Sequence, residues 1–170
     1  MLCVLDLTSQ CVEPSAIIYS LPDSSFTAST TWPSGNDHNP YRSRLYTNTD
    51  AGVVGAWQAQ LPEAGQWIQA DLLETHTVQG FATRGRDQST QYPTAYEFAL
   101  GLNGVGFESV ALSNGNAKIF GGNVDASSIV RHNISATSAR FARLIVLAWE
   151  GPLIALRWEI YACVTNSKYK

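Results

Sequence analysis

The sequence is poor in charged residues, and lysine is almost absent. Charged residues make up 15% of its 170 residues, the formal net charge is −3, and lysine stands only at positions 118, 168 and 170. Strong binding of nucleic acid depends on clustered lysine and arginine side chains that neutralise phosphates. We therefore expect no nucleic-acid partner for this chain.

Long hydrophobic runs are missing as well. The most apolar stretches, such as "LIVLAW" at residues 144–149, are far shorter than the roughly 20 residues that a transmembrane helix needs. No window of helical length repeats apolar residues at intervals of three and four without an interrupting cluster of Gly, Pro, Ser or Thr. The sequence predicts neither a membrane-spanning helix nor a helical fold.

What the sequence has in abundance is the alternation of apolar and polar residues that is typical of β-strands. Apolar residues make up 45% of the chain and aromatic residues 11%, which suffices for one domain with a buried core. Alternation is found at residues 66–72, 95–102, 139–149 and 153–163, with shorter candidates at 77–83, 107–112, 117–120 and 128–134. About eight short strands with turn signals between them predict an all-β fold, an antiparallel sandwich or barrel.

The last of these segments, "LIALRWEIYAC", ends on Cys163, whereas the other two cysteines, Cys3 and Cys11, stand near the beginning of the chain. If the two chain ends are neighbours, a bridge to Cys163 would close a loop that contributes roughly 4 to 5 kcal/mol by the loop-entropy model. Three cysteines allow three pairings, and three free thiols in a cytosolic protein are the alternative. The residues alone leave these alternatives open.

A set of motifs resembles one known family. The chain contains, in the expected order, "TASTTW", "SRLYTNTDAGVVGAW", "GQWIQADL", "VQGFATRGR", "YPTAYEFALGLNGVGFESV", "IFGGN", "ARFARLIVL" and "IALRWEIYAC". They are similar to the discoidin domain, also called the coagulation factor V/VIII C-type domain, over residues 11–163. Residues 1–10 would then be an N-terminal extension, and residues 164–170 a polar tail. The resemblance implies a jelly-roll β-sandwich, a Cys11–Cys163 disulfide and a spare Cys3.

The resemblance also implies where a ligand binds, namely at loops at one end of the sandwich. The segment "TRGRDQSTQYPTAY" resembles a ligand-binding loop of the slime-mould discoidin lectins, with Arg86 in the place of a ligand-contacting arginine and Tyr92 in the place of a tryptophan. An arginine fork and an aromatic face are what a saccharide requires. The loop departs from the lectin pattern at Asp87 and Gln88, so the resemblance does not by itself imply galactose specificity. Because an arginine beside an aspartate in a loop is usually a solvated pair, such a pair of Arg86 and Asp87 is the alternative.

Tryptophans divide into one candidate contact residue and two core residues. Trp32, in "STTW", resembles the loop tip that collagen-binding discoidin receptors and phospholipid-binding coagulation factors use for contact. The alternative for Trp32 is packing beneath its own loop. Trp57 and Trp67 resemble core positions of the family, so we expect both to pack inside the domain.

Two further sites are suggested without being required. Asp50, in "NTDAG", lies near the position at which calcium-dependent relatives place loop oxygens, and calcium needs six to eight of them. The sequence otherwise requires no cofactor. Asn133, in "NIS", is a glycosylation acceptor if the protein is secreted, and an ordinary strand residue if it is not.

No enzymatic motif is found: the three histidines stand apart, and HExxH, GxSxG and CxxC are missing. We therefore expect no enzyme. The function predicted is an extracellular adhesion or recognition module, secreted or on the cell surface, that binds a galactose-type glycan through Trp32, Arg86, Asp87 and Tyr92. Binding of collagen or a receptor protein is the alternative. Binding of anionic phospholipid is disfavoured by polar loop tips. Weak single sites of this kind would fit a multidomain or oligomeric protein.

Overall fold

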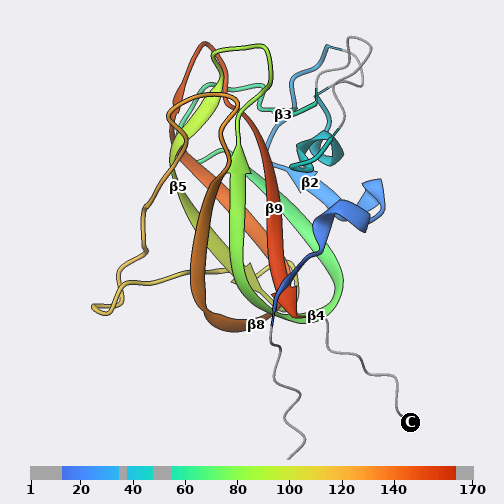
Figure 1. Cartoon of the computed structure of the whole chain (residues 1–170), viewed down its shortest axis with the longest axis vertical. Helices are drawn as coiled ribbons and strands as arrows, with labels where there is room; N and C mark the ends of the chain where they lie inside the picture. The colour runs from blue at the N-terminus through green and yellow to red at the C-terminus, as the bar shows by residue number, and fades with distance from the viewer. Residues whose placement is uncertain (1–12, 35–37, 48–54, 164–170) are drawn as a thin grey trace, which may run out of the picture.

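A computed structural model describes residues 13–34, 38–47 and 55–163 as a jelly-roll β-sandwich (Figure 1). This part of the chain has nine β-strands, three short 3₁₀-helices and no α-helix, and every strand pair is antiparallel, which confirms the predicted fold class. None of its helices is long and apolar enough to cross a membrane. The elements are β1 (Ser15–Ala16), η1 (Ile18–Ser20), η2 (Asp23–Ser25), β2 (Phe26–Ala28), η3 (Pro40–Ser43), β3 (Trp57–Gln58), β4 (Trp67–Arg84), β5 (Tyr92–Gly101), β6 (Glu108–Ser109), β7 (Phe120–Gly121), β8 (Val130–Glu150) and β9 (Ala155–Cys163).

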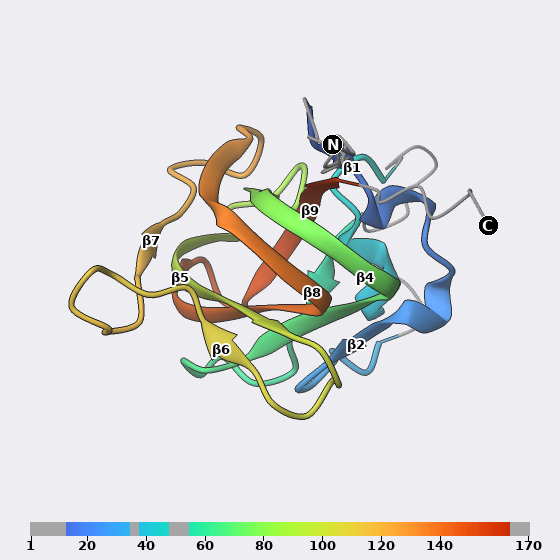
Figure 2. The same ribbon diagram turned by 90° about the horizontal axis from the view of Figure 1, so that it is seen from below.

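Two long bent strands, β4 and β8, build both layers of the sandwich. They pair with each other along most of their length, from Trp67 opposite Ile145 to Thr83 opposite Val130. Their register shifts between Asp71 and His76, where both strands bend at the lower end of Figure 1. Figure 2 shows that the two halves of each strand run in different directions. The segments 66–72 and 77–83, predicted as separate strands, therefore form one strand, and so do 128–134 and 139–149.

The strands follow the order β1-β9-β4-β8-β5-β6, with β2 paired to β4, β3 to β9 and β7 to β5. Pairing of Ser15 with Ala162 places the first described strand against the last, which confirms that the two ends of the domain lie side by side. The predicted strands at 107–112 and 117–120 are much shorter in the structure, where only β6 and the start of β7 fall within them.

The core lies between the layers and is rich in aromatic side chains. The ring of Phe81 stacks on that of Phe98 with 4.1 Å between centroids, and meets Tyr96 and Phe120 edge-on. The Tyr96 hydroxyl forms hydrogen bonds with the Thr83 hydroxyl at 2.8 Å and with Nε2 of His132 at 3.1 Å. Burial raises the pKa of Tyr96 to about 12. This core fixes β4 and β5, whose connection carries the candidate ligand residues.

Strand β9 is buried on both of its faces. The apolar face packs Leu156, Trp158 and Ile160 into the core, while Arg157 and Glu159 on the other face are 1% and 0% exposed. A charged side chain is rarely buried unless it is paired or hydrogen-bonded. The partners of Arg157 and Glu159 therefore reveal which parts of the chain β9 holds in place.

Cys163 ends β9 and is buried and disulfide-bonded. Cys3 and Cys11 both lie outside the described residues, so the pairing of Cys163 with Cys11 stays a prediction. Peptide mapping of the non-reduced protein by mass spectrometry is expected to recover a peptide that joins Cys11 to Cys163, with Cys3 alkylated as a free thiol. A peptide joining Cys3 to Cys163 would contradict the predicted pairing.

Candidate functional site

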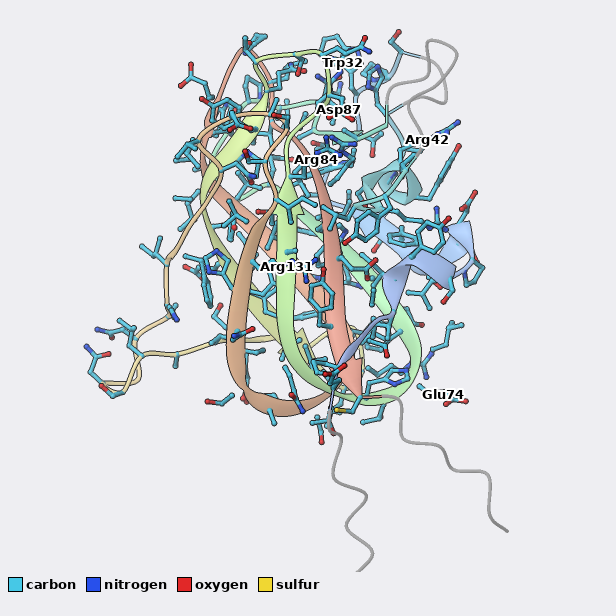
Figure 3. All side chains as sticks on the ribbon, in the orientation of Figure 1. Trp32, Arg42, Glu74, Arg84, Asp87 and Arg131 are labelled. Atoms are coloured by element: carbon cyan, nitrogen blue, oxygen red, sulfur yellow. The ribbon has the colours of Figure 1, made fainter. Side chains whose placement is uncertain are left out.

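The loop that carries Trp32 is anchored to the first part of the sandwich. The Trp32 amide donates to the carbonyl oxygen of Gln58 at 2.8 Å, and the Trp57 indole donates to the carbonyl oxygen of Thr30 at 3.0 Å. Thr30 also donates to the Gln66 side chain at 2.5 Å. Trp32 itself is half-buried, and Figure 3 places it at the upper end of the molecule, away from the bends of β4 and β8.

The turn between β4 and β5 carries Arg86 and closes on itself. The Arg86 amide donates to the Gln91 carbonyl at 2.9 Å, and Nη1 of Arg86 donates to Oε1 of Gln91 at 2.8 Å. Gln88 has a φ of 56°, in the left-handed region that few side chains adopt. Gly85 is required at its position because a Cβ there would lie 2.7 Å from Cα of Ala126. The turn therefore presents Arg86 in a fixed position.

Two buried glutamines connect the Arg86 turn to the Trp32 loop. Nε2 of Gln58 donates to Oε1 of Gln91 at 3.0 Å, and the same oxygen accepts from Arg86. Gln58 and Gln91 are 2% and 5% exposed. Because the backbone of Gln58 also holds Trp32, the structure brings Trp32 and Arg86 to the same end of the sandwich. Sequence analysis missed both glutamines, and their only signal was a polar residue next to the aromatic residues of "AWQ" and "QYP".

Asp87 does not pair with Arg86. Its carboxylate is held by Arg157, with Nη1 of Arg157 at 2.8 Å from Oδ2 and Nη2 at 2.6 Å from Oδ1, and Arg84 lies 3.0 Å away. Nε of Arg157 also donates to the Gly85 carbonyl at 2.9 Å. The hydrogen bond with Arg157 holds the pKa of Asp87 below its usual range. Both carboxylate oxygens are thus used to fasten the turn onto β9.

Tyr92 begins β5 directly after the turn. It is half-buried and pairs with Glu150 across the sheet, and its Cβ is one of the atoms that leave no room for a side chain at Gly85. Of the four predicted ligand residues, three therefore lie on one continuous stretch, 86–92, which the two glutamines join to the fourth, Trp32. Figure 3 shows Asp87 and Arg84 successively further from the end at which Trp32 lies.

The remaining predicted residues lie elsewhere. Trp57 is fully buried, as predicted. Trp67 is half-buried, and the Arg143 guanidinium lies 4.0 Å from its ring and 4.0 Å from that of Phe107 on the other side. Asn133 is exposed on β8. Asp50 lies outside the described residues, so the calcium prediction is untested. Within residues 13–34, 38–47 and 55–163, no group of three His, Cys, Asp or Glu side chains could hold a metal.

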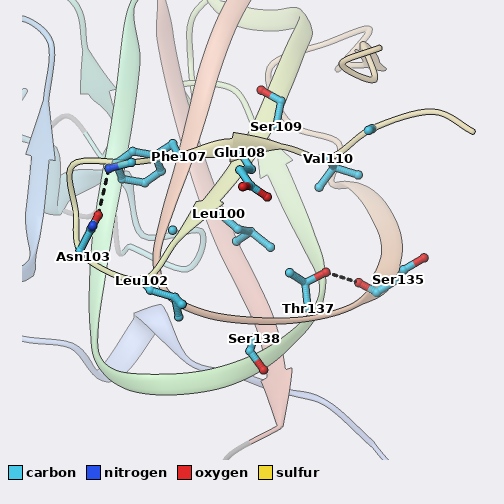
Figure 4. Close-up of a pocket in the computed structure, with 13 residues that line it drawn as sticks. Leu100, Leu102, Asn103, Phe107, Glu108, Ser109, Val110, Ser135, Thr137 and Ser138 are labelled. Carbon is cyan, nitrogen blue, oxygen red and sulfur yellow. Dashed lines mark hydrogen bonds between the residues drawn. The ribbon is translucent and has the colours of Figure 1, made fainter. Parts of the chain in front are cut away.

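A pocket of about 710 Å³ lies at the other end of the sandwich, where β5 ends and β8 bends (Figure 4). Its floor is apolar, with Leu100 and Val110, and its rim carries Ser135, Thr137 and Ser138. Thr137 donates to the Ser135 carbonyl at 2.9 Å. This pocket contains none of the predicted ligand residues and is separate from the Trp32 and Arg86 loops.

A β-sandwich with ligand-type side chains on loops at one end is the architecture of a binding module. The chain matches the model of the F5/8 type C domain over residues 25–160. It is 37% identical over 163 residues to bovine lactadherin, which covers 90% of this chain and 37% of lactadherin. The chain therefore belongs to the F5/8 type C, or discoidin, domain family, and it spans little more than a third of the lactadherins that it matches.

Solved structures agree with this assignment. Discoidin II from Dictyostelium discoideum has a TM-score of 0.72 and 25% identity, covering 85% of this chain and 56% of that one. A CBM32 domain from Clostridium perfringens, solved in complex with GalNAc-β-1,3-galactose, has a TM-score of 0.67 and 18% identity, covering 87% of this chain and all of that one. At that level of identity, the second likeness shows the fold alone.

Proposed function

We propose that this domain is an extracellular recognition module that binds a carbohydrate, in particular a galactose-type glycan, through Trp32, Arg86 and Tyr92. The observation that carries the proposal is the chain of hydrogen bonds from Arg86 through Gln91 and Gln58 to the backbone of Trp32. It supports a surface on which an arginine fork and aromatic side chains are held together before a ligand arrives. Preorganised polar and aromatic groups are the requirements of saccharide recognition.

The residues divide the work between contact and positioning. Arg86 makes a single side-chain hydrogen bond within the described residues, to Gln91, so its remaining donors are free for neighbouring hydroxyls of a sugar. Trp32 and Tyr92 offer aromatic faces to the apolar side of a ring. Asp87 serves the proposed site through Arg157, because its oxygens are already taken. A domain of this fold holds a galactose-containing disaccharide, so the ligand class suits the scaffold.

Location outside the cell, or on its surface, follows from the same proposal. A disulfide at Cys163 fits an oxidising compartment, in which such bonds persist. Exposed Asn133 would be open to glycosylation there. Adhesion through several copies, in a longer or oligomeric protein, would compensate for weak single sites.

The test is a glycan array followed by titration of the best ligand. Arg86→Ala is expected to weaken binding by about tenfold or more, the worth of one good charge-assisted hydrogen bond. Its melting temperature should stay within about 2 °C of that of the wild type, because Gln91 keeps its bond from Gln58. Arg140→Ala is the matched control, since Arg140 pairs with Asp71 away from the loops and should leave binding unchanged.

Other outcomes would replace the proposal. An array without any bound glycan, with the folded protein retained by collagen or sedimenting with phosphatidylserine vesicles, would assign the same loops to a protein or a lipid. Trp32→Ala would then be the variant that identifies the surface. The loops offer little for a membrane, since Trp32 and Tyr92 are half-buried instead of exposed.

A further inference from the structure

A second hollow lies on the flank of the sandwich, and none of its lining residues belongs to the Arg86 turn. It has a volume of about 490 Å³, and its lining residues come from η1, η2 and η3 and from the turn that follows η3. Figure 3 shows Arg42 at this flank, to the side of and below Trp32. The hollow is lined by three tyrosines, two arginines, one carboxylate and one threonine: Tyr19, Tyr41, Tyr46, Arg42, Arg44, Asp23 and Thr47.

One of its two arginines holds the walls together. Nη1 of Arg44 donates to the Tyr41 carbonyl at 2.7 Å, and Nη2 donates to the Leu21 carbonyl at 2.6 Å and to Asp23 at 2.7 Å. The guanidinium also lies 4.6 Å from the centroid of the Phe26 ring. Arg44 thereby ties η3 to the segment before β2. Its charge is used within the protein.

The other arginine, Arg42, has no such partner. Within the described residues its side chain makes no hydrogen bond or ion pair, and its Nε is buried without an acceptor. The guanidinium lies 5.4 Å from the centroid of the Tyr41 ring, so it is held beside the aromatic wall. A half-buried guanidinium with unused donors is a binding position for a planar anion, because the fork fits a carboxylate in two parallel hydrogen bonds.

The tyrosines that line the hollow offer aromatic faces and hydroxyl groups to a ligand. Tyr19 and Tyr46 are large aromatic residues that are 59% and 47% exposed. The Tyr46 hydroxyl accepts a long hydrogen bond, 3.4 Å, from Nη2 of Arg131. The backbone next to Tyr19 is held, since the Ile18 amide donates to buried Glu159 at 2.8 Å. Exposed aromatic faces suit the apolar side of a sugar ring, and their hydroxyls suit its polar edge.

The charges that line the hollow favour a ligand with a single negative charge. Of the two lining arginines, Arg42 has no ion pair within the described residues, and Asp23 adds a carboxylate at the rim with a side chain that is 63% exposed. Lysine is almost absent from the chain, whose net charge is −3. A polyanionic chain would need several cations along its path, and the arginine next to the hollow, Arg131, already bonds Tyr46 and packs on the Tyr161 ring.

We propose that this hollow binds an acidic monosaccharide unit, with Arg42 on the sugar carboxylate and Tyr19 and Tyr46 against the ring. This site is additional to the one at Trp32 and Arg86 and does not depend on it. The two together would let the domain hold two separate parts of an acidic glycan, or two glycans.

The experiment titrates the ¹⁵N-labelled full chain by two-dimensional NMR with methyl β-D-glucuronide, with neutral methyl β-D-glucoside and with sodium acetate. The glucuronide should shift the amides of residues 19 and 41–47 and bind about tenfold more tightly than either of the others. Equal binding of the glucoside would overturn the role of Arg42. Equal binding of acetate would show that the hollow is a simple anion site and would overturn the proposal that its ligand is a saccharide.

Variants then locate the binding. Arg42→Gln should weaken glucuronide binding about tenfold, whereas Lys118→Gln, which removes one positive charge beside Phe120, should leave it unchanged. Tyr19→Ala should weaken it, and Tyr19→Phe should restore most of it. Arg86→Ala should have no effect. If Arg86→Ala removes glucuronide binding while Arg42→Gln retains it, the second site does not exist.

Discussion

Replacing Asp87 with asparagine is expected to lower the free energy of unfolding by about 3 kcal/mol. Arg157 is 1% exposed, and its guanidinium relies on both oxygens of Asp87, at 2.8 and 2.6 Å. Removing one partner of a buried ion pair leaves the other charge without compensation, which costs far more than the pair itself gains. Urea unfolding at pH 7, followed by tryptophan fluorescence, measures the change.

Asp71→Asn is the matched control for Asp87→Asn. Asp71 also forms a two-pronged pair, with Nε and Nη2 of Arg140 both at 2.9 Å, but the Arg140 side chain is 43% exposed. Exposed pairs contribute little, so the loss should stay below about 1 kcal/mol. Equal losses in the two variants would show that burial of Arg157 does not decide the effect.

Asp87 also gives the protein a dependence on pH. The pKa of Asp87 is lower in the folded protein than the ordinary value of 3.8, chiefly through its hydrogen bond with Arg157. The stabilisation by Asp87 is therefore complete above pH 3.8 or so and is lost as the pH falls through the lowered value. Asp87→Asn should remove this part of the acid sensitivity. The variant should also bind glycan less well, since the pair fastens the turn that carries Arg86.

Several properties of the fold could be predicted from the sequence, because they depend on local patterns. Alternation over residues 153–163 predicted β9, and the Cys11–Cys163 disulfide implied by the family resemblance predicted neighbouring termini. The bends of β4 and β8 could not be predicted. Residues 72–76 of β4, "LLETH", contain no Gly or Pro, yet Leu73 adopts a φ of 68° there. A bend made by an ordinary residue leaves no signal in composition.

The candidate site, like the fold, could be predicted from the sequence only in part. Arg86, Tyr92 and Trp32 were found because residue type and order resemble a family. The groups that position them were missed because they act across long separations: Arg157 reaches Asp87 over 70 residues, and Gln58 reaches Gln91 over 33. Alternation in β9 assigns Arg157 and Glu159 to one face, but it cannot tell whether loops cover that face. In the structure, loops do cover this polar face of β9, so it is buried like the apolar face.

Replacement of Glu159, on that face, is the second substitution for which we expect a large loss of stability. Its Oε1 accepts the amides of Ile18 at 2.8 Å and Ile160 at 2.9 Å. Glu159→Leu would leave two amide donors without an acceptor, and we expect it to lower the free energy of unfolding by about 3 kcal/mol. Since the Ile18 bond holds the backbone next to Tyr19, this variant should also weaken binding at the flank hollow. Glu159→Gln keeps an acceptor oxygen and should stay within about 1 kcal/mol of the wild type.

Comparison of the wild type with Glu159→Gln isolates the cost of the buried charge. Burial is the main cause that raises the pKa of Glu159 above its ordinary 4.5. A carboxyl group whose pKa is raised by folding destabilises the protein fully above that raised value and not at all below 4.5 or so. The wild type should therefore gain stability relative to Glu159→Gln as the pH falls from neutral toward 5. His132, whose pKa is lowered by burial, changes both proteins equally. A constant difference in unfolding free energy between pH 7 and pH 5 would contradict a titrating Glu159.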